Sequence, residues 1–371
     1  MALKKNSRSF IRNLSLSFGE IDIPLFAAVA AISLFGIINM YGISGWEGGF
    51  LIKQIIFVAA GLFLMFAFSF WNYRYLKNYS LPVLLFYIFC LFLLVLTFYS
   101  KSIRGVNSWL VLGGFTFEPA ELAKLMMIIL MAKYFSQRHV HINELKYVVV
   151  SGIYFLLPAT IMIIQPDLGS AIIFAMIWMA MLFVAGINKK HLFLILIAGA
   201  VAFYVSWAVI LHPYQKDRII SFINPHDDPY GRGYNLIQSR VAIGSGYLFG
   251  NGLGKGSQVA QGFLPEARND FIFAATAEQF GFAGITFLMG LSGFILYRIL
   301  NIGRMSGFNF GKLFSIGMAV FIFSHILVGA AVNIGLMPIT GIPFPFISYG
   351  GSSMVSIMIG LGILQSIKRY G

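Results

Sequence analysis

The stretch EARNDFIFAATAEQFGFAGITFLMGLSGFILY, residues 266–297, decides the fold class of this chain. Its first five residues are mostly charged or polar, and the segment from 271 to 297 then carries a single charged side chain, Glu278. An apolar run of this length can cross the hydrocarbon core of a bilayer, which is about 30 Å thick. The stretch therefore predicts a transmembrane helix that follows directly on a polar segment at a membrane surface.

The rest of the chain repeats this pattern. Of its 371 residues 58% are hydrophobic and 11% are charged, and the mean hydropathy is +0.83. Soluble domains carry about 25% charged residues, so a soluble enzyme is excluded. We expect an all-α polytopic membrane protein with a single domain over 1–371 and ten transmembrane helices, at about 23–43, 54–71, 80–99, 119–136, 148–165, 168–187, 192–211, 271–297, 313–334 and 351–367.

The basic residues predict an orientation. With a cytoplasmic N-terminus, 16 of the 26 Lys and Arg residues fall on the cytoplasmic side, as the positive-inside rule requires. Both termini are then cytoplasmic, and the long polar loop 212–270 is extracytoplasmic. Ten of the 13 acidic residues fall on the outer side, so any chemistry is expected there. The net charge of +13 is divided between two membrane faces and does not indicate a nucleic-acid partner.

A first polar cluster, EPAELAK at 118–124, begins the predicted fourth span. Pro119 suits a first helical turn, and Glu121 and Lys124 are spaced to share one helix face and pair. Acidic residues at the start of a helix can also simply stabilise its positive end. Lys124, however, already lies within the apolar segment, where an ionisable group is a candidate functional residue.

Two further clusters fall between predicted spans. Asp167, in the turn QPDLGS at 165–170, either caps the sixth span or belongs to a site. The loop 212–270 is rich in glycine and carries Arg218, Gln238 and Arg240; it is either a flexible surface loop or a site where backbone amides and cations hold an anionic headgroup. The spacing of a nucleotide-binding loop fails at 250–256, so no nucleotide is expected.

The last polar residues lie at or within the spans near the C-terminus. A helix cap would explain Asp270 but not Glu278, which needs a wet cavity or a partner. The segment GIPFPFISYGGSS at 341–353 cannot continue a helix, and irregular backbone at a membrane interface is tolerated where it lines a cavity. His325 is interpreted as a packed interhelical hydrogen-bonding residue.

On four of these segments the chain resembles the SEDS family (shape, elongation, division and sporulation proteins), and its rod-shape branch more than its division branch. The segments are QPDLGS at 165–170, NPHDDPYGRGYNLIQSRVAIGSG at 224–246, GFLPEARNDFIFA at 262–274 and PFPFISYGGSS at 343–353. The resemblance implies ten spans and a peptidoglycan glycosyltransferase that polymerises lipid II at the outer face of the bacterial cytoplasmic membrane. It also implies a class B penicillin-binding protein and other membrane proteins of the elongation complex as partners.

The family's essential aspartate matches Asp270, and the glutamate and lysine of its PSE..K motif match Glu121 and Lys124. Joining a sugar hydroxyl to a sugar that leaves a lipid diphosphate needs a carboxylate to take the hydroxyl proton, and Asp270 is the expected base. The expected substrate-binding residues are Glu121, Lys124, Asp167, Arg218, Gln238, Arg240, Glu266, Glu278, Ser348 and Ser352.

Positive charge must stabilise the departing diphosphate. Lys124, Arg218, Arg240 or a divalent metal held by the outer carboxylates can supply it. The sequence holds no cage of metal ligands, so the metal expected is Mg²⁺ or Mn²⁺ bound partly through the diphosphate.

Two other classes of function remain open from the sequence. A flippase for lipid-linked precursors also needs a polar cavity beside apolar walls, but its polar path must continue to the cytoplasmic side. A noncatalytic scaffold of the wall-synthesis complex explains the spans but not Glu278.

Overall fold

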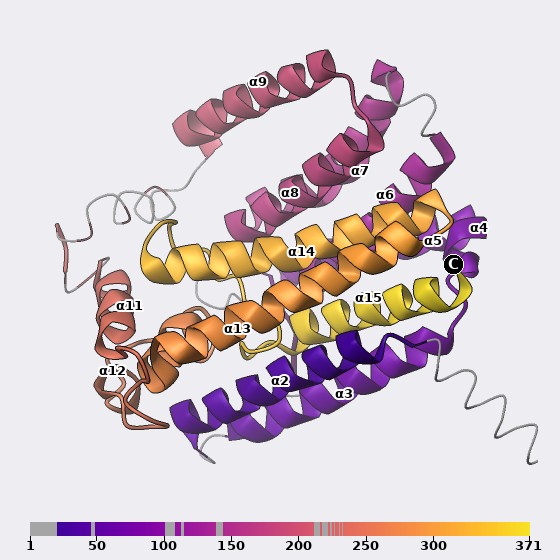
Figure 1. The fold of residues 1–371 in the computed structure, drawn as a ribbon. Coiled ribbons are helices and arrows are strands. Elements are labelled where there is room, and N and C mark those ends of the chain that lie inside the picture. Colours follow the sequence, from indigo (N-terminus) through magenta and orange to yellow (C-terminus); the bar gives the residue numbers. More distant parts are fainter. Residues whose placement is uncertain are drawn as a thin grey trace, which may run out of the picture.

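The computed structural model describes residues 21–45, 49–100, 108–112, 115–138, 144–210, 216, 222, 225, 227–229, 231 and 233–371. These residues are mostly helical (Figure 1). In chain order the elements are α2 (Ile23–Ser44), α3 (Phe50–Phe70), α4 (Arg74–Asn78), α5 (Ser80–Leu96), the 3-10 turn η2 (Thr97–Tyr99), β1 (Leu110–Leu112), β2 (Phe115–Phe117), α6 (Pro119–Arg138), α7 (Leu145–Ile164), α8 (Leu168–Ala185), α9 (Lys189–Val205), the π-helical turn η3 (Ser206–Ile210), α11 (Tyr234–Ser245), α12 (Ser257–Ala260), α13 (Ile272–Met305), α14 (Asn309–Ile334) and α15 (Gly351–Tyr370).

Each of the ten predicted spans coincides with a helix. Nine helices of the described ranges are long and apolar enough to cross a membrane, which confirms a multi-pass membrane protein. The one predicted span outside this set is the fourth, α6, whose first 15 residues include the charged side chains Glu121, Lys124 and Lys133. The count of ten spans and the sides of the termini stay predictions. Several boundaries were wrong, most of all three: α3 begins at Phe50 rather than 54, α14 begins at Asn309 rather than 313, and α13 continues to Met305 rather than ending at 297.

The expectation of an all-α chain missed one element. Strands β1 and β2 form a short antiparallel hairpin, with Leu110 opposite Phe117 and Val111 opposite Thr116. Valine, threonine and aromatic residues favour extended backbone, and the apolar run is too short for a span. The hairpin leads directly into α6 and so sets where that helix begins.

Helix α14 lies at the centre of the bundle and packs against α6, α8, α13 and α15. Figure 1 shows α11 and α12, which belong to the predicted outer loop, at one end of the bundle and the C-terminus at the other. Among the described side chains of α9, none is buried. The two ends of the bundle therefore differ in kind, because only one of them carries the long polar loop.

The end opposite that loop is closed by a charged cluster. Asp22, which is 1% exposed, caps α2 by accepting the Leu25 N–H and is bound by Arg298 of α13 and Lys368 of α15. The Asp22 N–H in turn donates to Gln365 Oε1 at 2.7 Å. Three helices far apart in sequence thus meet at one carboxylate.

Helix α13 is broken at Gly281, where φ is 65° and ψ is −162°. Only glycine adopts this region readily. The backbone groups freed by the break are bonded to the turn that follows α11: the Phe282 N–H donates to the Tyr247 carbonyl at 2.9 Å, and the Asn251 N–H donates to the Glu278 carbonyl at 2.9 Å. The break is therefore a stable part of the fold, because the backbone groups that it frees are hydrogen-bonded within the protein.

We predict that Gly281→Ala destabilises the protein and that Gly290→Ala, in the same helix, does not. A Cβ at residue 281 would lie 2.4 Å from the Gly250 nitrogen, whereas a Cβ at residue 290 meets nothing within 4 Å. Strained backbone of this kind costs about 1–3 kcal/mol. Thermal unfolding of both variants in one detergent measures the difference, and equal midpoints would contradict the prediction.

Candidate active site

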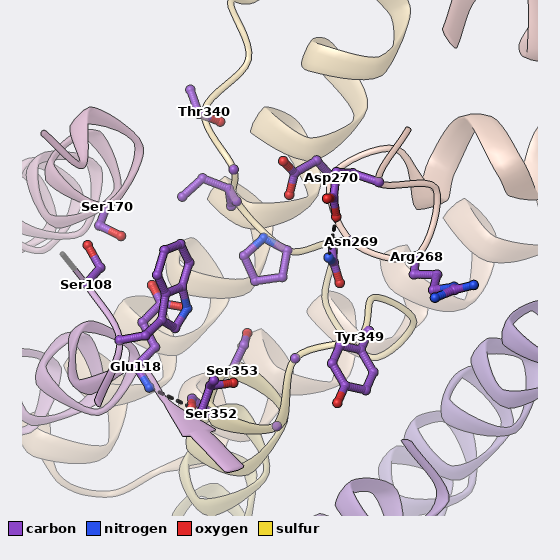
Figure 2. Close-up of a pocket in the computed structure, with 18 of the residues that line it drawn as sticks. Ser108, Glu118, Ser170, Arg268, Asn269, Asp270, Thr340, Tyr349, Ser352 and Ser353 are labelled. Carbon is purple, nitrogen blue, oxygen red and sulfur yellow. Dashed lines mark hydrogen bonds between the residues drawn. The ribbon is translucent and has the colours of Figure 1, made fainter. Parts of the chain in front are cut away.

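A cavity of about 430 Å³ opens at the end of the bundle that carries α11 and α12. Its wall is built from five segments that are distant in sequence (Figure 2). They are Phe50 and Phe57 of α3, residues in and beside the hairpin up to Glu118, the turn before α8, the turn 265–271 before α13, and the segment 339–353 before and into α15. Two of these segments, 265–271 and 339–350, are irregular backbone. The prediction that 341–353 lines a cavity is confirmed for 341–343 and 349–353.

Four carboxylates line this cavity: Glu118, Asp167, Glu266 and Asp270. In Figure 2, Glu118 and Asp270 come from opposite sides of the cavity. Burial, followed by the neighbouring carboxylates, raises the pKa of Glu118 well above its usual value. Burial also raises the pKa of Asp167, although the Ser170 N–H opposes this. Four acidic groups are therefore concentrated in a small space, and their burial favours the neutral forms of Glu118 and Asp167.

The position of Asp270 is fixed through its backbone. The Asp270 carbonyl accepts from Asn333 Nδ2 of α14 at 2.8 Å, and the Ala274 N–H, one turn further on, donates to Asn333 Oδ1 at 3.0 Å. The turn before Asp270 is closed by Glu266, whose φ is +54° and whose carbonyl accepts from the Phe271 N–H at 3.2 Å. The side chain of Asp270 is half-buried at the cavity wall.

The 265–271 turn is tied to the 344–349 segment. Ser348 accepts from the Phe344 N–H at 2.8 Å and donates to the Asn269 carbonyl at 2.9 Å, and the Tyr349 N–H donates to the Arg268 carbonyl at 2.9 Å. The Arg268 guanidinium lies 4.3 Å from the centre of the Phe50 ring. Ser348 does not line the cavity, so the structure gives it a positioning role in place of the expected substrate contact.

Ser352 and Asp167 each pair with a backbone N–H group and also line the cavity. The Ser352 hydroxyl accepts from the Glu118 N–H at 2.9 Å, and Asp167 caps α8 by accepting from the Ser170 N–H at 2.9 Å. Both also line the cavity. The cap and the site, which the sequence offered as alternatives for Asp167, therefore coexist.

Glu121 and Lys124 pair as predicted, but behind the cavity wall. Lys124 Nζ lies 2.6 Å from Glu121 Oε1, and both side chains are 0% exposed. The ring of His325, from α14, contacts both the pair and the wall residue Pro343: Nε2 is 3.5 Å from Lys124 Nζ and 3.7 Å from Glu121 Oε2, and Nδ1 is 3.1 Å from the Pro343 carbonyl. The interpretation of His325 as an interhelical hydrogen-bonding residue is confirmed.

The remaining predicted residues lie elsewhere. Both oxygens of Glu278 accept backbone N–H groups, from Gln258 and Val259, so this carboxylate holds α12 against α13 and does not line the cavity. Arg240 donates to the Gly335 carbonyl at the end of α14 at 3.1 Å. Gln238 is half-buried and also absent from the wall. Arg218 lies outside the described residues.

Several described backbone amides of the glycine-rich loop are paired within the protein and are not open to a headgroup. The N–H groups of Asn251 and Gly252 donate to the carbonyls of Glu278 and Gln279, and those of Gln258 and Val259 are used by Glu278. These N–H donors are therefore already hydrogen-bonded within the protein.

The sequence did not single out several wall residues: Trp109, Thr116, Glu118 and Thr340. Glu118 could have been found, because it opens the EPAELAK cluster and directly precedes a helix start. Asn333 carried no signal, since an amide within an apolar span reveals nothing of which backbone groups it binds.

Comparisons with known proteins agree with the resemblance. The family profile FtsW/RodA/SpoVE, described as cell cycle protein, matches residues 21–371. The chain belongs to this family. It is 32% identical over 352 residues to the peptidoglycan glycosyltransferase MrdB of Escherichia coli K12, covering 95% of this chain and 94% of MrdB. It is 33% identical over 319 residues to the stage V sporulation protein E of Bacillus subtilis, covering 86% of this chain.

Solved structures share the fold. A chain from a peptidoglycan synthase complex, described as coordinating polymerization and crosslinking, superimposes with a TM-score of 0.80 at 29% identity and covers 94% of this chain and 98% of that one. RodA of Thermus thermophilus superimposes with a TM-score of 0.70 at 27% identity and covers 94% of this chain and 97% of its own. The elongation, division and sporulation relatives are similar at comparable levels, so the branch stays a prediction.

We predict that the Glu121 and Lys124 charges stabilise the fold only as a pair. Lys124→Met alone leaves a buried carboxylate without its cation, which typically costs about 3–5 kcal/mol. The double variant Glu121→Gln with Lys124→Met removes both charges and should recover most of this loss. Thermal unfolding of the three proteins measures it. A single variant as stable as the double would show that the pair is not coupled.

Proposed function

We propose that this chain is a peptidoglycan glycosyltransferase that polymerises lipid II into glycan strands. The proposal rests on the position of Asp270, a half-buried carboxylate held by its backbone at the wall of a cavity at the end of a membrane bundle. Membership in a family whose relatives include the peptidoglycan glycosyltransferase MrdB gives the substrate class.

Asp270 acts as the general base. The hydroxyl oxygen of the acceptor sugar bonds to the anomeric carbon of the donor sugar, and the bond from that carbon to the lipid diphosphate breaks. Asp270 takes the hydroxyl proton as the new bond forms, and the electron pair of the broken bond leaves with the diphosphate. Asn333 and Ser348 fix the backbone on either side of Asp270, so the base is held in place before substrate arrives.

The charges of the cavity wall call for an added cation. Among the described lining residues four are carboxylates and only Arg268 is basic, whereas the leaving diphosphate is itself anionic. Lys124 and Arg240, expected to meet the diphosphate, are engaged by Glu121 and by Gly335. In the described part of the chain no three His, Cys, Asp or Glu side chains form a metal cluster.

We therefore infer a divalent cation, Mg²⁺ or Mn²⁺, held by one or two of the wall carboxylates and by the substrate diphosphate. The wall residues fit this group, since the carboxylates other than Asp270 offer oxygen ligands and the diphosphate would complete the coordination. When bound, the cation neutralises charge on the leaving diphosphate. No nucleotide takes part.

A flippase is less well supported. A translocation path would have to continue from the cavity towards the other end of the bundle, but α6 beyond Lys124 is buried and apolar from Leu125 to Ala132. A noncatalytic scaffold has no use for four carboxylates around one cavity.

The chain works in the bacterial cytoplasmic membrane, with both termini cytoplasmic and loop 212–270 outside. Its cavity end meets the lipid-linked precursor on the outer face. A class B penicillin-binding protein and other elongation-complex membrane proteins are its partners, in support of which a structural relative comes from a peptidoglycan synthase complex.

Replacing Asp270 with Asn should reduce lipid II polymerisation about 10²–10⁴-fold, because the amide keeps the size of the side chain but cannot take the proton. Polymerisation of labelled lipid II by purified protein, with and without a class B partner, measures the rate. The matched control is Asp227→Asn, an exposed aspartate outside the cavity wall. A folded Asp270→Asn protein with near wild-type activity would refute the assignment. A variant that loses polymerisation but still binds lipid II would support it.

The orientation predicts which cysteines a membrane-impermeant reagent reaches in intact cells. In a background with the buried Cys90 changed to Ala, Ser257→Cys should react and Gly307→Cys should not. Both positions are exposed and lie at opposite ends of α13. The reverse labelling pattern would invert the topology, and lysed cells, in which both cysteines should react, provide the control.

A further inference from the structure

The turn after α11 exposes three large apolar side chains in succession. Tyr247 is 82% exposed, Leu248 is 64% exposed and Phe249 is 82% exposed. Tyr247 has a φ of +44°, a conformation that non-glycine residues rarely adopt. A chain that leaves these three side chains in water forgoes their burial, so the outward turn needs an environment that accepts them.

The turn is fastened to the break in α13. The Tyr247 carbonyl accepts the Phe282 N–H at 2.9 Å, and the Leu248 carbonyl accepts the Ala283 N–H at 3.0 Å. Residues 247 and 248 are thus at the same height along the bundle as the start of the unbroken part of α13.

This height corresponds to a bilayer boundary. From Phe282 to Met305 the helix has 24 residues, or about 36 Å at 1.5 Å per residue, which is enough to cross a hydrocarbon core of about 30 Å. The break therefore falls near the membrane interface. Phe282 is 67% exposed and Phe287 is 50% exposed on the same helix, so the apolar turn continues a lipid-facing surface.

The charges around the turn match a lipid surface. From Val241 to Gly254 the chain has no charged residue, and the next residue on either side is a cation, Arg240 or Lys255. Aromatic side chains flanked by Arg and Lys are typical of the interface between the hydrocarbon core and the anionic headgroups.

We propose that Tyr247, Leu248 and Phe249 form a membrane-interface anchor that inserts into the bilayer at the cavity end of the bundle. Through the backbone bonds to Phe282 and Ala283 the anchor sets the height of the first part of α13, and so of Asp270, relative to the lipid surface. The insertion stands on the exposure and contacts of the turn alone, whereas its consequence for Asp270 rests on the proposed function.

Spin labelling tests the insertion. In the Cys90→Ala background, a nitroxide is attached to Phe249→Cys and, as the control, to Ser257→Cys, and each protein is reconstituted without partners in vesicles of zwitterionic and anionic lipids. The label at 249 should collide more with oxygen, which concentrates in lipid, than with a water-soluble nickel chelate, and the label at 257 should show the opposite preference. A second label at Leu248→Cys guards against a local disturbance at 249.

Nickel accessibility at 249 and 248 equal to that at 257 would overturn the anchor. Protection that appears only after a class B penicillin-binding protein is added would also overturn it, since the turn would then be a protein contact.

Polymerisation tests the consequence for Asp270. The double variant Leu248→Ser with Phe249→Ser should lose activity several-fold in vesicles but keep it in detergent, because a micelle imposes no fixed plane. The control is Phe294→Ser, a partly exposed position on α13 away from the turn. Equal losses in vesicles and detergent would refute the height-setting role. Absence of polymerisation by the unmodified protein in both media would instead refute the proposed function and leave the labelling result standing.

Discussion

One buried amide holds the cavity end of the bundle together. Asn333 is 1% exposed, and its side chain accepts the Ala274 N–H and donates to the carbonyls of Asp270 and Gly329, while its own carbonyl accepts the Ser239 hydroxyl. Helices α11, α13 and α14 therefore meet at a single residue. In an apolar interior an amide that lost these partners would carry the full cost of desolvation, so the arrangement is nearly obligatory once α14 is packed. The position of Asp270 follows from the need to pair the buried Asn333 amide, which donates to the Asp270 carbonyl.

The same constraint explains why irregular backbone is concentrated at this end. A membrane tolerates non-helical segments only where their polar groups are paired within the protein or face a cavity. Described bonds of this kind include Ser348 closing the 344–349 segment onto Asn269, Ser352 receiving the N–H of Glu118, and Glu278 receiving two amides of α12. Ser348, Ser352 and Glu278, which were expected to bind substrate, all hydrogen-bond to backbone groups. By pairing these groups they stabilise the non-helical segments at this end of the bundle.

How much the sequence could predict follows from which interactions are local. Apolar runs placed each of the ten predicted spans on a helix, because a helix that crosses lipid must be mostly apolar. The spacing of Glu121 and Lys124 predicted their pairing, because residues three apart share one face of a helix. The break at Gly281 was not predicted, because it depends on bonds to residues 247–252, more than 25 positions earlier in the chain. Glu278 was expected to need a wet cavity or a partner. Its partners, two backbone N–H groups of α12, lie 20 and 19 positions earlier in the chain, so no local pattern identified them.

The separation of Glu121 and Lys124 from the cavity has a chemical consequence. A lysine that reached the diphosphate directly would leave Glu121 as an uncompensated charge in the bundle, a state that costs several kcal/mol. Held by Glu121 and by the ring of His325, Lys124 can influence the site at less cost through its field and through the Pro343 carbonyl that His325 contacts. In the proposed mechanism, the charge on the leaving group is then left to Arg268, the basic residue among the described lining residues, and to the divalent cation that we infer.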